Sequence, residues 1–360
     1  MPLSKEAVLD VLKAVKFPGF SRDIVSFGLV RGVDPQEDLL EVSLALTTAD
    51  PNIPMQIKQE AEAALTRSFP DLKEINVVVA VSRPSSGAPG APGASNAAPP
   101  VDQLKRVKFK IAVASGKGGV GKSTFATNLA CALSEVLAEK GHTQVVGIMD
   151  CDIYGPSVPL MMGIQQQPEI ENDLIQPISN FGIKVMSMGF LIDEDTPVVW
   201  RGPMIMKTIQ QFAQNVAWGE LDVLIIDLPP GTGDAQLSLV QTIPLDGALI
   251  VTTPQAAAVN VARKGARMFG QVNVPLLGVA ENMSYFENPG TGQKDYLFGQ
   301  GGGARAALEL QAPFVGQIPL DPAIREGSDV GVPILIGNPE SRASEAFRGV
   351  ASQLVAQLLK

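Results

Sequence analysis

The sequence predicts an α/β protein in which a small α+β domain precedes a domain built on a parallel sheet. Apolar, β-branched runs alternate with helix-like segments through the C-terminal two thirds of the chain. Runs that are apolar at every position are typical of strands buried on both faces, as in parallel sheets. A segment dominated by Pro, Gly, Ala and Ser lacks apolar periodicity and separates the two regions. We therefore expect a domain at residues 1–83, a linker at 84–104 and a second domain at 105–360.

The N-terminal domain is expected to contain two helices and two strands. Apolar residues at helical spacing predict helices over Lys5–Val15 and Ile57–Ser68. Strand patterns cover Leu39–Leu46 and Ile75–Val81. This set of elements indicates a small α+β unit.

The second domain is expected to form an open parallel sheet with helices between its strands. Helical patterns include Lys122–Ala138, Met206–Val216 and Ala343–Leu359. In such sheets, ligands bind at the carboxyl ends of the strands. The predicted strands are Lys110–Ala114, Val145–Met149, Lys184–Met188, Val223–Ile226, Ala248–Thr252, Leu276–Ala280 and Phe314–Gln317.

The segment Ser115–Thr124 (SGKGGVGKST) contains G-x-x-x-x-G-K-S between a predicted strand and a predicted helix. This is the phosphate-binding loop, or P-loop, of nucleoside triphosphatases, and the strand–loop–helix context is the one it requires. Backbone N–H groups and the helix N-terminus supply positive potential for phosphates. Lys122 is expected to neutralise the outer phosphates, and Ser123 to offer its hydroxyl to Mg²⁺. The expected nucleotide-binding residues are Gly116, Lys117, Gly118, Gly119, Val120, Gly121, Lys122, Ser123 and Thr124.

A second lysine, Lys117, follows the first glycine of the loop. The pattern K-G-G-x-G-K-[ST] resembles the deviant Walker A motif of the MinD/ParA/nitrogenase-reductase ATPases. That resemblance implies a homodimer with two ATP molecules between its subunits, in which Lys117 reaches the partner's nucleotide. A cation supplied by the partner stabilises charge on a transferring phosphoryl group, as an arginine finger does. The alternative is that Lys117 is a solvated loop lysine.

Carboxylates follow two of the predicted strands. Asp227 ends VLIID before LPPGTGD and resembles a Walker B aspartate, although an N-cap role is the alternative. Asp150 and Asp152 follow another strand and resemble a switch I pair. The resemblance implies that Ser123, Asp150 and Asp227 serve the metal and that Asp152 orients or deprotonates the attacking water. The expected catalytic residues are then Lys117, Lys122 and Asp152.

Asn282 follows a third strand end, in GVAENMSYF. The resemblance to MinD-like ATPases places Asn282 at the adenine-recognition position. A side-chain amide both donates to and accepts from a base edge. The alternative is an asparagine that forms a turn.

The strings DIYGPSVPLMMG, WRGPM, DLPPGTGD, ENMSYF and FGQGGG together resemble the Mrp/ApbC family of iron–sulfur cluster carrier ATPases. The resemblance covers Lys108 to the C-terminus. The N-terminal string DIVSFGLVRGV resembles the MIP18-type (DUF59) domain, although KFPGF stands where that family usually has an acidic segment. The resemblance implies ATP and Mg²⁺ as cofactors, slow ATP hydrolysis, and iron–sulfur assembly proteins and apo-protein clients as partners. The N-terminal domain is interpreted as a docking module.

The chain lacks the C-x-x-C pair that many members carry after SYF. Asn288 and Thr291 stand at those positions, and neither is an iron–sulfur ligand. Cys131 and Cys151 are the two cysteines of the chain; we expect Cys131 in the core and Cys151 between the switch aspartates. Whether a [4Fe–4S] cluster is bound stays open. An ATP-dependent scaffold whose partner supplies the ligands is the alternative.

Composition argues against several other classes of function. The net charge of −9 argues against non-specific nucleic-acid binding, and no apolar run is long enough to span a membrane. Two cysteines in 360 residues favour a cytoplasmic protein. A MinD/ParA-like positioning ATPase would need a basic tail or patch, whereas the C-terminal helix has a nearly uncharged polar face. Nitrogenase-type electron transfer would need a permanent cluster, and the cysteine count argues against this class.

Overall fold

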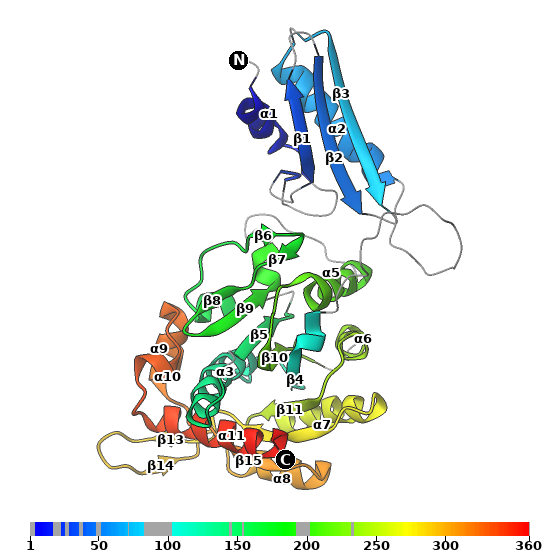
Figure 1. Cartoon of the computed structure of the whole chain (residues 1–360). Helices are drawn as coiled ribbons and strands as arrows, with labels where there is room; N and C mark the ends of the chain where they lie inside the picture. Colours follow the sequence, from blue (N-terminus) through cyan, green and yellow to red (C-terminus); the bar gives the residue numbers. More distant parts are fainter. Residues whose placement is uncertain are drawn as a thin grey trace. The chain divides into compact units, whose positions relative to one another are not determined.

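The computed structural model describes residues 4–16, 23–25, 29–35, 39–47, 52–70, 72–82, 103–143, 146–152, 155–191, 202–231 and 234–359. These residues form two compact units, each described here by itself (Figure 1). The smaller unit holds the elements from α1 to β3, and the larger holds those from η1 to α11. The predicted linker at 84–104 lies almost entirely outside the described residues.

The smaller unit packs two helices against a three-stranded sheet. The sheet order is β1-β2-β3, with β1 antiparallel and β3 parallel to β2. Both predicted helices and both predicted strands are present, but β1 was not predicted, because its sequence VRGVDP lacks a clear apolar alternation. Its elements are α1 (Lys5–Leu12), β1 (Val30–Pro35), β2 (Leu39–Thr47), α2 (Asn52–Ser68) and β3 (Glu74–Ser82).

The larger unit is built on an eight-stranded sheet in the order β15-β12-β11-β4-β10-β5-β9-β8. All seven predicted strands are present and parallel, which confirms the predicted fold class. The eighth strand, β8 (Ile178–Asn180), is a short antiparallel edge strand that the sequence analysis missed. The parallel strands are β4 (Val107–Ala114), β5 (Val146–Asp150), β9 (Ile183–Ser187), β10 (Leu221–Asp227), β11 (Gly247–Thr252), β12 (Leu276–Glu281) and β15 (Phe314–Gln317).

Helices cover both faces of this sheet (Figure 1). The C-terminal helix α11 packs on α3 and β15, and its residues Phe347, Val350, Leu354 and Val355 are buried. The longer helices are α3 (Lys122–Glu139), α5 (Gly202–Asn215), α6 (Asp234–Thr242), α7 (Ala256–Gln271), α8 (Gly302–Leu310), α9 (Pro322–Val330) and α11 (Arg342–Leu358). The short elements are η1 (Gln103–Arg106), α4 (Val158–Met161), β6 (Ile170–Glu171), β7 (Leu174–Ile175), η2 (Met188–Leu191), β13 (Phe286–Glu287), β14 (Lys294–Asp295) and α10 (Ile334–Gly337).

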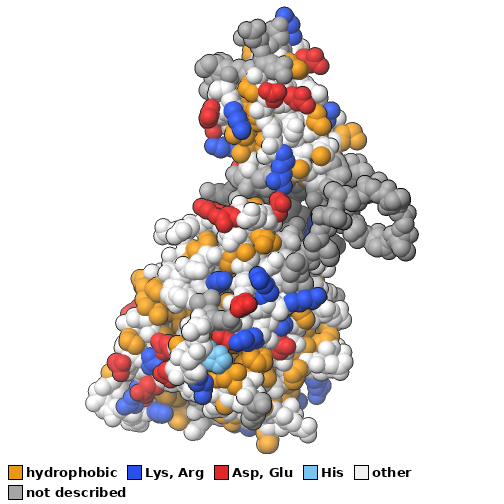
Figure 2. Space-filling model, in the orientation of Figure 1, with side chains coloured by type: hydrophobic (Ala, Val, Ile, Leu, Met, Phe, Trp, Pro, Cys, Tyr) orange, Lys and Arg blue, Asp and Glu red, His pale blue; other side chains and the backbone are white. Residues whose placement is uncertain are grey.

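Surface charge and helix length are relevant to binding of nucleic acid or of a membrane. On the face of the larger unit shown in Figure 2, acidic and basic side chains are interspersed. Of the helices that the structure describes, none has both the length and the apolar content needed to cross a bilayer.

The strand order brings three parallel strand ends together. β10 pairs with β4 on one side and with β5 on the other, so the P-loop after β4 lies next to the residues that follow β10 and β5. In register, Asp227 at the end of β10 stands opposite Asp150 at the end of β5. The topology therefore places the three predicted phosphate and metal segments at one edge of the sheet.

Candidate functional site

The P-loop borders a cavity of about 210 Å³ at the carboxyl ends of the strands. Ser115 and residues 117–124 line it, together with Asp152, Ser157, Met161 and Pro230. A larger hollow of about 610 Å³ lies between α1 and α2 of the smaller unit, and none of the residues that line it is a predicted site residue. The smaller cavity is the candidate site, because backbone amides, lysines and carboxylates converge there.

The loop backbone needs glycine at particular positions for different reasons. Gly119 and Gly121 have φ values of +80° and +73°, the left-handed region that side chains disfavour. Gly116 has a packing role instead, because a Cβ there would lie 2.3 Å from the backbone carbon of Val261 in α7. The loop is therefore held close against α7 as well as shaped for phosphate.

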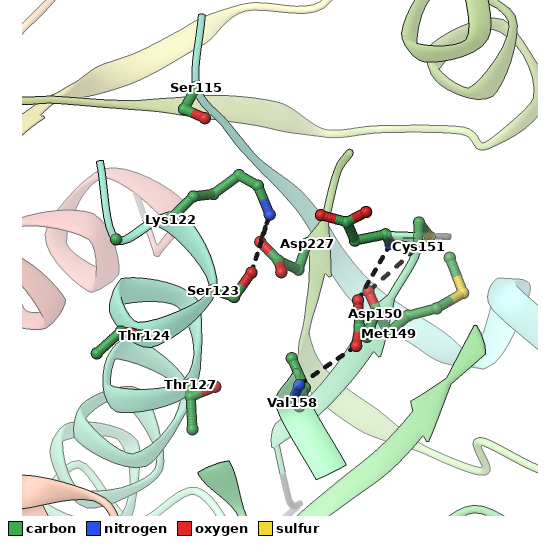
Figure 3. A network of polar contacts seen from close by, with 12 residues as sticks. Ser115, Lys122, Ser123, Thr124, Thr127, Met149, Asp150, Cys151, Val158 and Asp227 are labelled. Atoms are coloured by element: carbon green, nitrogen blue, oxygen red, sulfur yellow. Dashed lines mark hydrogen bonds and ion pairs between the residues drawn. The ribbon is translucent and has the colours of Figure 1, made fainter. Parts of the chain in front are cut away.

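Lys122, the first residue of α3, reaches Asp227 across the cavity floor (Figure 3). Its Nζ lies 2.6 Å from Asp227 Oδ1 and donates to Ser123 Oγ at 3.1 Å. Lys122 is 6% exposed and Asp227 is 0% exposed. Asp227 Oδ2 is buried and has no hydrogen-bond partner among the described residues. Burial raises the pKa of Asp227, and the charge of Lys122 opposes that rise.

Asp150 is held by a set of donors at the end of β5. Its Oδ1 accepts from the Asp152 N–H at 3.1 Å, and its Oδ2 accepts from Ser187 Oγ at 2.8 Å and from the Val158 N–H at 3.3 Å. Burial, followed by the charge of Asp227, raises the pKa of Asp150 to about 7. Of these two buried carboxyl groups, Asp227 forms the ion pair with Lys122, and the charge of Lys122 only partly offsets the rise in the pKa of Asp150.

The other two predicted catalytic residues lie at the cavity wall. Asp152 is buried and lines the cavity. Lys117 is exposed, and its ammonium group makes no ion pair with any residue in the described part of the chain. Its backbone is fixed, because Ser115 Oγ donates to the carbonyl oxygen of Lys117 at 3.0 Å.

Two further segments contact the P-loop, and the first belongs to the LPPGTGD string that follows Asp227. The Gly231 N–H, after β10, donates to the Ser115 carbonyl at 3.2 Å. In α4, Met161 Sδ accepts from Thr124 Oγ1 at 3.7 Å. Ser187 is a third addition, through its bond to Asp150. Gly231 and Met161 belong to the strings LPPGTGD and DIYGPSVPLMMG, whereas Ser187 lies in neither string and only proximity in the fold reveals it.

Asn282 lies against the P-loop backbone. Its Nδ2 donates to the Val120 carbonyl at 2.8 Å and lies 3.5 Å from the Gly121 carbonyl. Asn282 therefore does more than form its own turn, because its side chain contacts a segment 162 residues away in the sequence. Recognition of adenine by Asn282 stays a prediction.

The residues present do not fit a thiolate-ligated cluster. Both cysteines are buried, as expected for Cys131. Burial raises the pKa of Cys131 to about 12, and burial together with Asp150 and Asp227 raises the pKa of Cys151 well above its ordinary value. At the family's cysteine positions, Asn288 Oδ1 accepts from the N–H groups of Gly290 and Thr291 at 2.9 and 3.2 Å. The Asn288 side chain thereby closes the turn between β13 and β14.

Within the described residues, no group of three or more His, Cys, Asp or Glu is arranged to hold a metal. The candidate magnesium ligands are fewer: one serine hydroxyl and the strand-end carboxylates. Mg²⁺ commonly keeps several waters and takes only one or two carboxylates from the protein. The unpartnered oxygen of Asp227, close to Ser123, fits that requirement.

Comparisons with known proteins agree with this geometry. Residues 106–355 match the family described as NUBPL iron-transfer P-loop NTPase, and residues 5–79 match a family described as iron–sulfur cluster assembly protein. The iron–sulfur cluster carrier protein of Synechocystis is 42% identical over 364 residues, which cover 99% of this chain and 98% of that protein.

Two solved structures are similar to the larger unit. A nucleotide-binding protein of Archaeoglobus fulgidus in complex with ADP is 40% identical, with a TM-score of 0.58, covering 68% of this chain and 94% of that one. The cell division ATPase MinD of Pyrococcus furiosus is 22% identical, with a TM-score of 0.51 and 69% and 99% coverage, and shares the fold. The predicted resemblance is confirmed: the chain belongs to the NUBPL family of iron-transfer P-loop NTPases, with an iron–sulfur cluster assembly domain at residues 5–79.

Proposed function

We propose that the protein is an Mg²⁺-dependent ATPase that acts as an iron–sulfur cluster carrier or assembly factor in the maturation of iron–sulfur proteins. The observation that carries the proposal is the buried Lys122–Asp227 pair beneath a P-loop, with one Asp227 oxygen unpartnered. The family match, the relative named as a cluster carrier and the ADP complex of the Archaeoglobus protein support it.

The chain's own groups divide the work of binding. The N–H groups of Gly116–Thr124 and the Lys122 ammonium would hold the β- and γ-phosphates. Ser123 and Asp227 would ligate Mg²⁺, and Asp150 would support it through water. Bound there, Mg²⁺ would supply positive charge to the phosphate oxygens. A triphosphate would draw Lys122 away from Asp227, whose carboxylate would then be free for the metal.

Hydrolysis would use the two remaining predicted residues. Asp152 would orient or deprotonate the water that attacks the γ-phosphorus, releasing ADP and phosphate. Lys117, exposed and without an ion pair in the described part of the chain, would stabilise the developing charge at the nucleotide of a second subunit. The proposal therefore includes a homodimer, because Lys117 would act at the nucleotide of the other subunit. Phosphoryl transfer depends on positioned charge more than on a strong base.

A specific observation favours a second candidate, in which partners supply the cluster ligands. Both thiols of the chain are buried, and the turn at Asn288 is closed by its own hydrogen bonds. The protein would then be an ATP-dependent scaffold that docks iron–sulfur assembly proteins and apo-protein clients without ligating the cluster itself. Anaerobic reconstitution with iron and sulfide separates the two: stoichiometric, transferable iron supports the carrier, and its absence with ATPase intact supports the scaffold.

The remaining features complete the proposal. Residues 1–83 would recruit or regulate partners, joined through a linker at 84–104 to the ATPase domain at 105–360. The protein would be cytoplasmic, since its two cysteines are free. With a net charge of −9, it would act without nucleic acid or membrane.

The central test uses the full-length protein. Calorimetric titration with Mg·ADP and Mg·AMP-PNP should show saturable binding, and phosphate release from ATP should require Mg²⁺. Absence of binding to either nucleotide in the presence of Mg²⁺ would overturn the proposal.

A further inference from the structure

We propose that Asn282 is a positioning residue that orients the Val120–Gly121 peptide of the P-loop, so that the side chain governs phosphate affinity as well as any contact with a base. The inference rests on the proposed nucleotide-binding function. It differs from a base-recognition role because its effect does not depend on which base is present.

The backbone of Asn282 is fixed on both sides. Its N–H donates to the Thr252 carbonyl at the end of β11 at 2.8 Å. The next residue, Met283, has a φ of +52°, and the Ser284 N–H donates to the Ile318 carbonyl at 2.9 Å. The buried Glu281 anchors the same turn, since its Oε1 accepts from Ser284 Oγ at 2.6 Å. The side chain therefore starts from a rigid support.

From this support the amide lies directly on the loop. Asn282 Nδ2 donates to the Val120 carbonyl at 2.8 Å, and a Cβ placed on Gly121 would lie 2.5 Å from Nδ2. Gly121 thus has two reasons to be glycine: its φ of +73° and the closeness of Asn282. Any larger residue at 121 would push the amide away from the carbonyl.

The planarity of the peptide turns this contact into control of a phosphate donor. In a trans peptide, C=O and N–H point in opposite directions. Holding the Val120 carbonyl toward Asn282 therefore turns the Gly121 N–H away from Asn282. Gly121 lines the cavity, and its N–H makes no hydrogen bond within the part of the chain that the structure describes. Asn282 therefore keeps the Gly121 N–H oriented to donate to a phosphate oxygen.

The other end of the amide remains available for a base. Asn282 Oδ1 accepts no hydrogen bond from any described residue, so it could still accept from an exocyclic amine such as that of adenine. Because one planar group carries both atoms, a base bound at Oδ1 would steady the amide that holds the loop.

The test compares ligands with and without a base. Mg·AMP-PNP, Mg·GMP-PNP and Mg·tripolyphosphate are titrated into the full-length wild type, Asn282→Ala, Asn282→Asp and the control Asn273→Asp. Asn273 is exposed and follows α7, before the start of β12, so its substitution makes the same amide-to-carboxylate change away from the loop. Thermal melting reports whether each variant is folded.

We expect both Asn282 variants to weaken the binding of all three ligands by a similar factor, about tenfold. The reason is that the buried Val120 carbonyl loses its hydrogen bond from Asn282. Asn282→Ala is the deciding variant, since the aspartate also adds negative charge near the phosphates. Asn273→Asp should bind as wild type. A loss in Asn282→Ala confined to AMP-PNP, with GMP-PNP and tripolyphosphate unchanged, would overturn the inference. Failure of the wild type to bind any nucleotide would instead overturn the proposed function.

Discussion

Nζ of Lys122 and Oδ1 of Asp227 lie 2.6 Å apart, so the lysine that begins α3 and the carboxylate that ends β10 form one buried ion pair. The two residues are 105 positions apart in sequence and meet because β10 lies next to β4. The pair holds the lysine beside Asp227, and the lysine's charge opposes the rise in the pKa of Asp227 that burial causes.

Removal of Lys122 should abolish nucleotide binding and destabilise the fold. Lys122→Met leaves Asp227 buried without its partner, a loss typically of about 3–5 kcal/mol in the free energy of unfolding. The double variant Lys122→Met/Asp227→Asn should recover most of that stability while still failing to bind nucleotide. Urea unfolding and titration with Mg·ADP measure the two effects. Equal stability of the single and double variants would contradict the ion pair's role.

Lys117→Ala should bind Mg·ADP like wild type but lose ATP turnover. A cation supplied to a phosphoryl transition state is worth about 10³–10⁵ in kcat in related systems. The control is Lys140→Ala, since Lys140 is an exposed lysine beyond the end of α3. Phosphate release measures turnover.

Mixing two variants that are each expected to be inactive tests whether Lys117 acts on the partner's nucleotide. A heterodimer of Lys117→Ala with Asp152→Asn contains one site that has both wild-type groups only if the lysine comes from the other subunit. Random mixing should then restore up to about a quarter of wild-type turnover, given two sites related by dimer symmetry. No recovery, although subunits exchange, would rule out the trans role.

Asp150 should make stability fall as the pH rises from about 4 to about 7. Its pKa is raised from 3.8 to about 7 in the folded protein, so the folded state binds the proton more tightly than the unfolded state across that window. This contribution is fully present below pH 3.8 and is lost as the pH rises through 7, at up to about 1.4 kcal/mol per pH unit.

The measurement is urea unfolding without nucleotide and with EDTA, from pH 4 to pH 8. Asp150→Asn should flatten the slope of unfolding free energy against pH, whatever its effect on absolute stability. Asp329→Asn, at an exposed carboxylate of α9, should keep the wild-type slope. An unchanged slope in Asp150→Asn would show that Asp150 does not hold the extra proton.

Gly116→Ala should be far more damaging than Gly118→Ala. A Cβ at 116 would meet the α7 backbone at 2.3 Å, whereas nothing lies within 4 Å of a Cβ at 118. We expect Gly116→Ala to lower the unfolding free energy by about 1–3 kcal/mol, since backbone cannot yield as a side chain can. Gly118→Ala should stay within about 0.5 kcal/mol of wild type. Similar unfolding curves for the two variants would contradict the packing role.

Neither cysteine should react with an aromatic disulfide reagent in the folded protein, and both should react in urea. Both thiols are buried and their pKa values are raised, so the reactive thiolate is scarce and shielded. Absorbance of the released thiolate counts the reactive groups. Rapid modification of Cys151 in the native state would reopen a cluster role for that residue.

The local features of the site could be predicted from the chain alone: the P-loop, the apolar strands and the aspartates that end them. These follow from a strand–loop–helix motif and from runs of apolar residues, which depend on neighbours a few positions away. Three contacts emerge only from the folded chain: Ser187 donates to Asp150, α7 packs on Gly116, and Asn282 donates to Val120. Each of these pairs joins segments brought together by the strand order, in which β9 lies beside β5 and β11 lies beside β4 and β12, and no periodicity in the chain encodes that order.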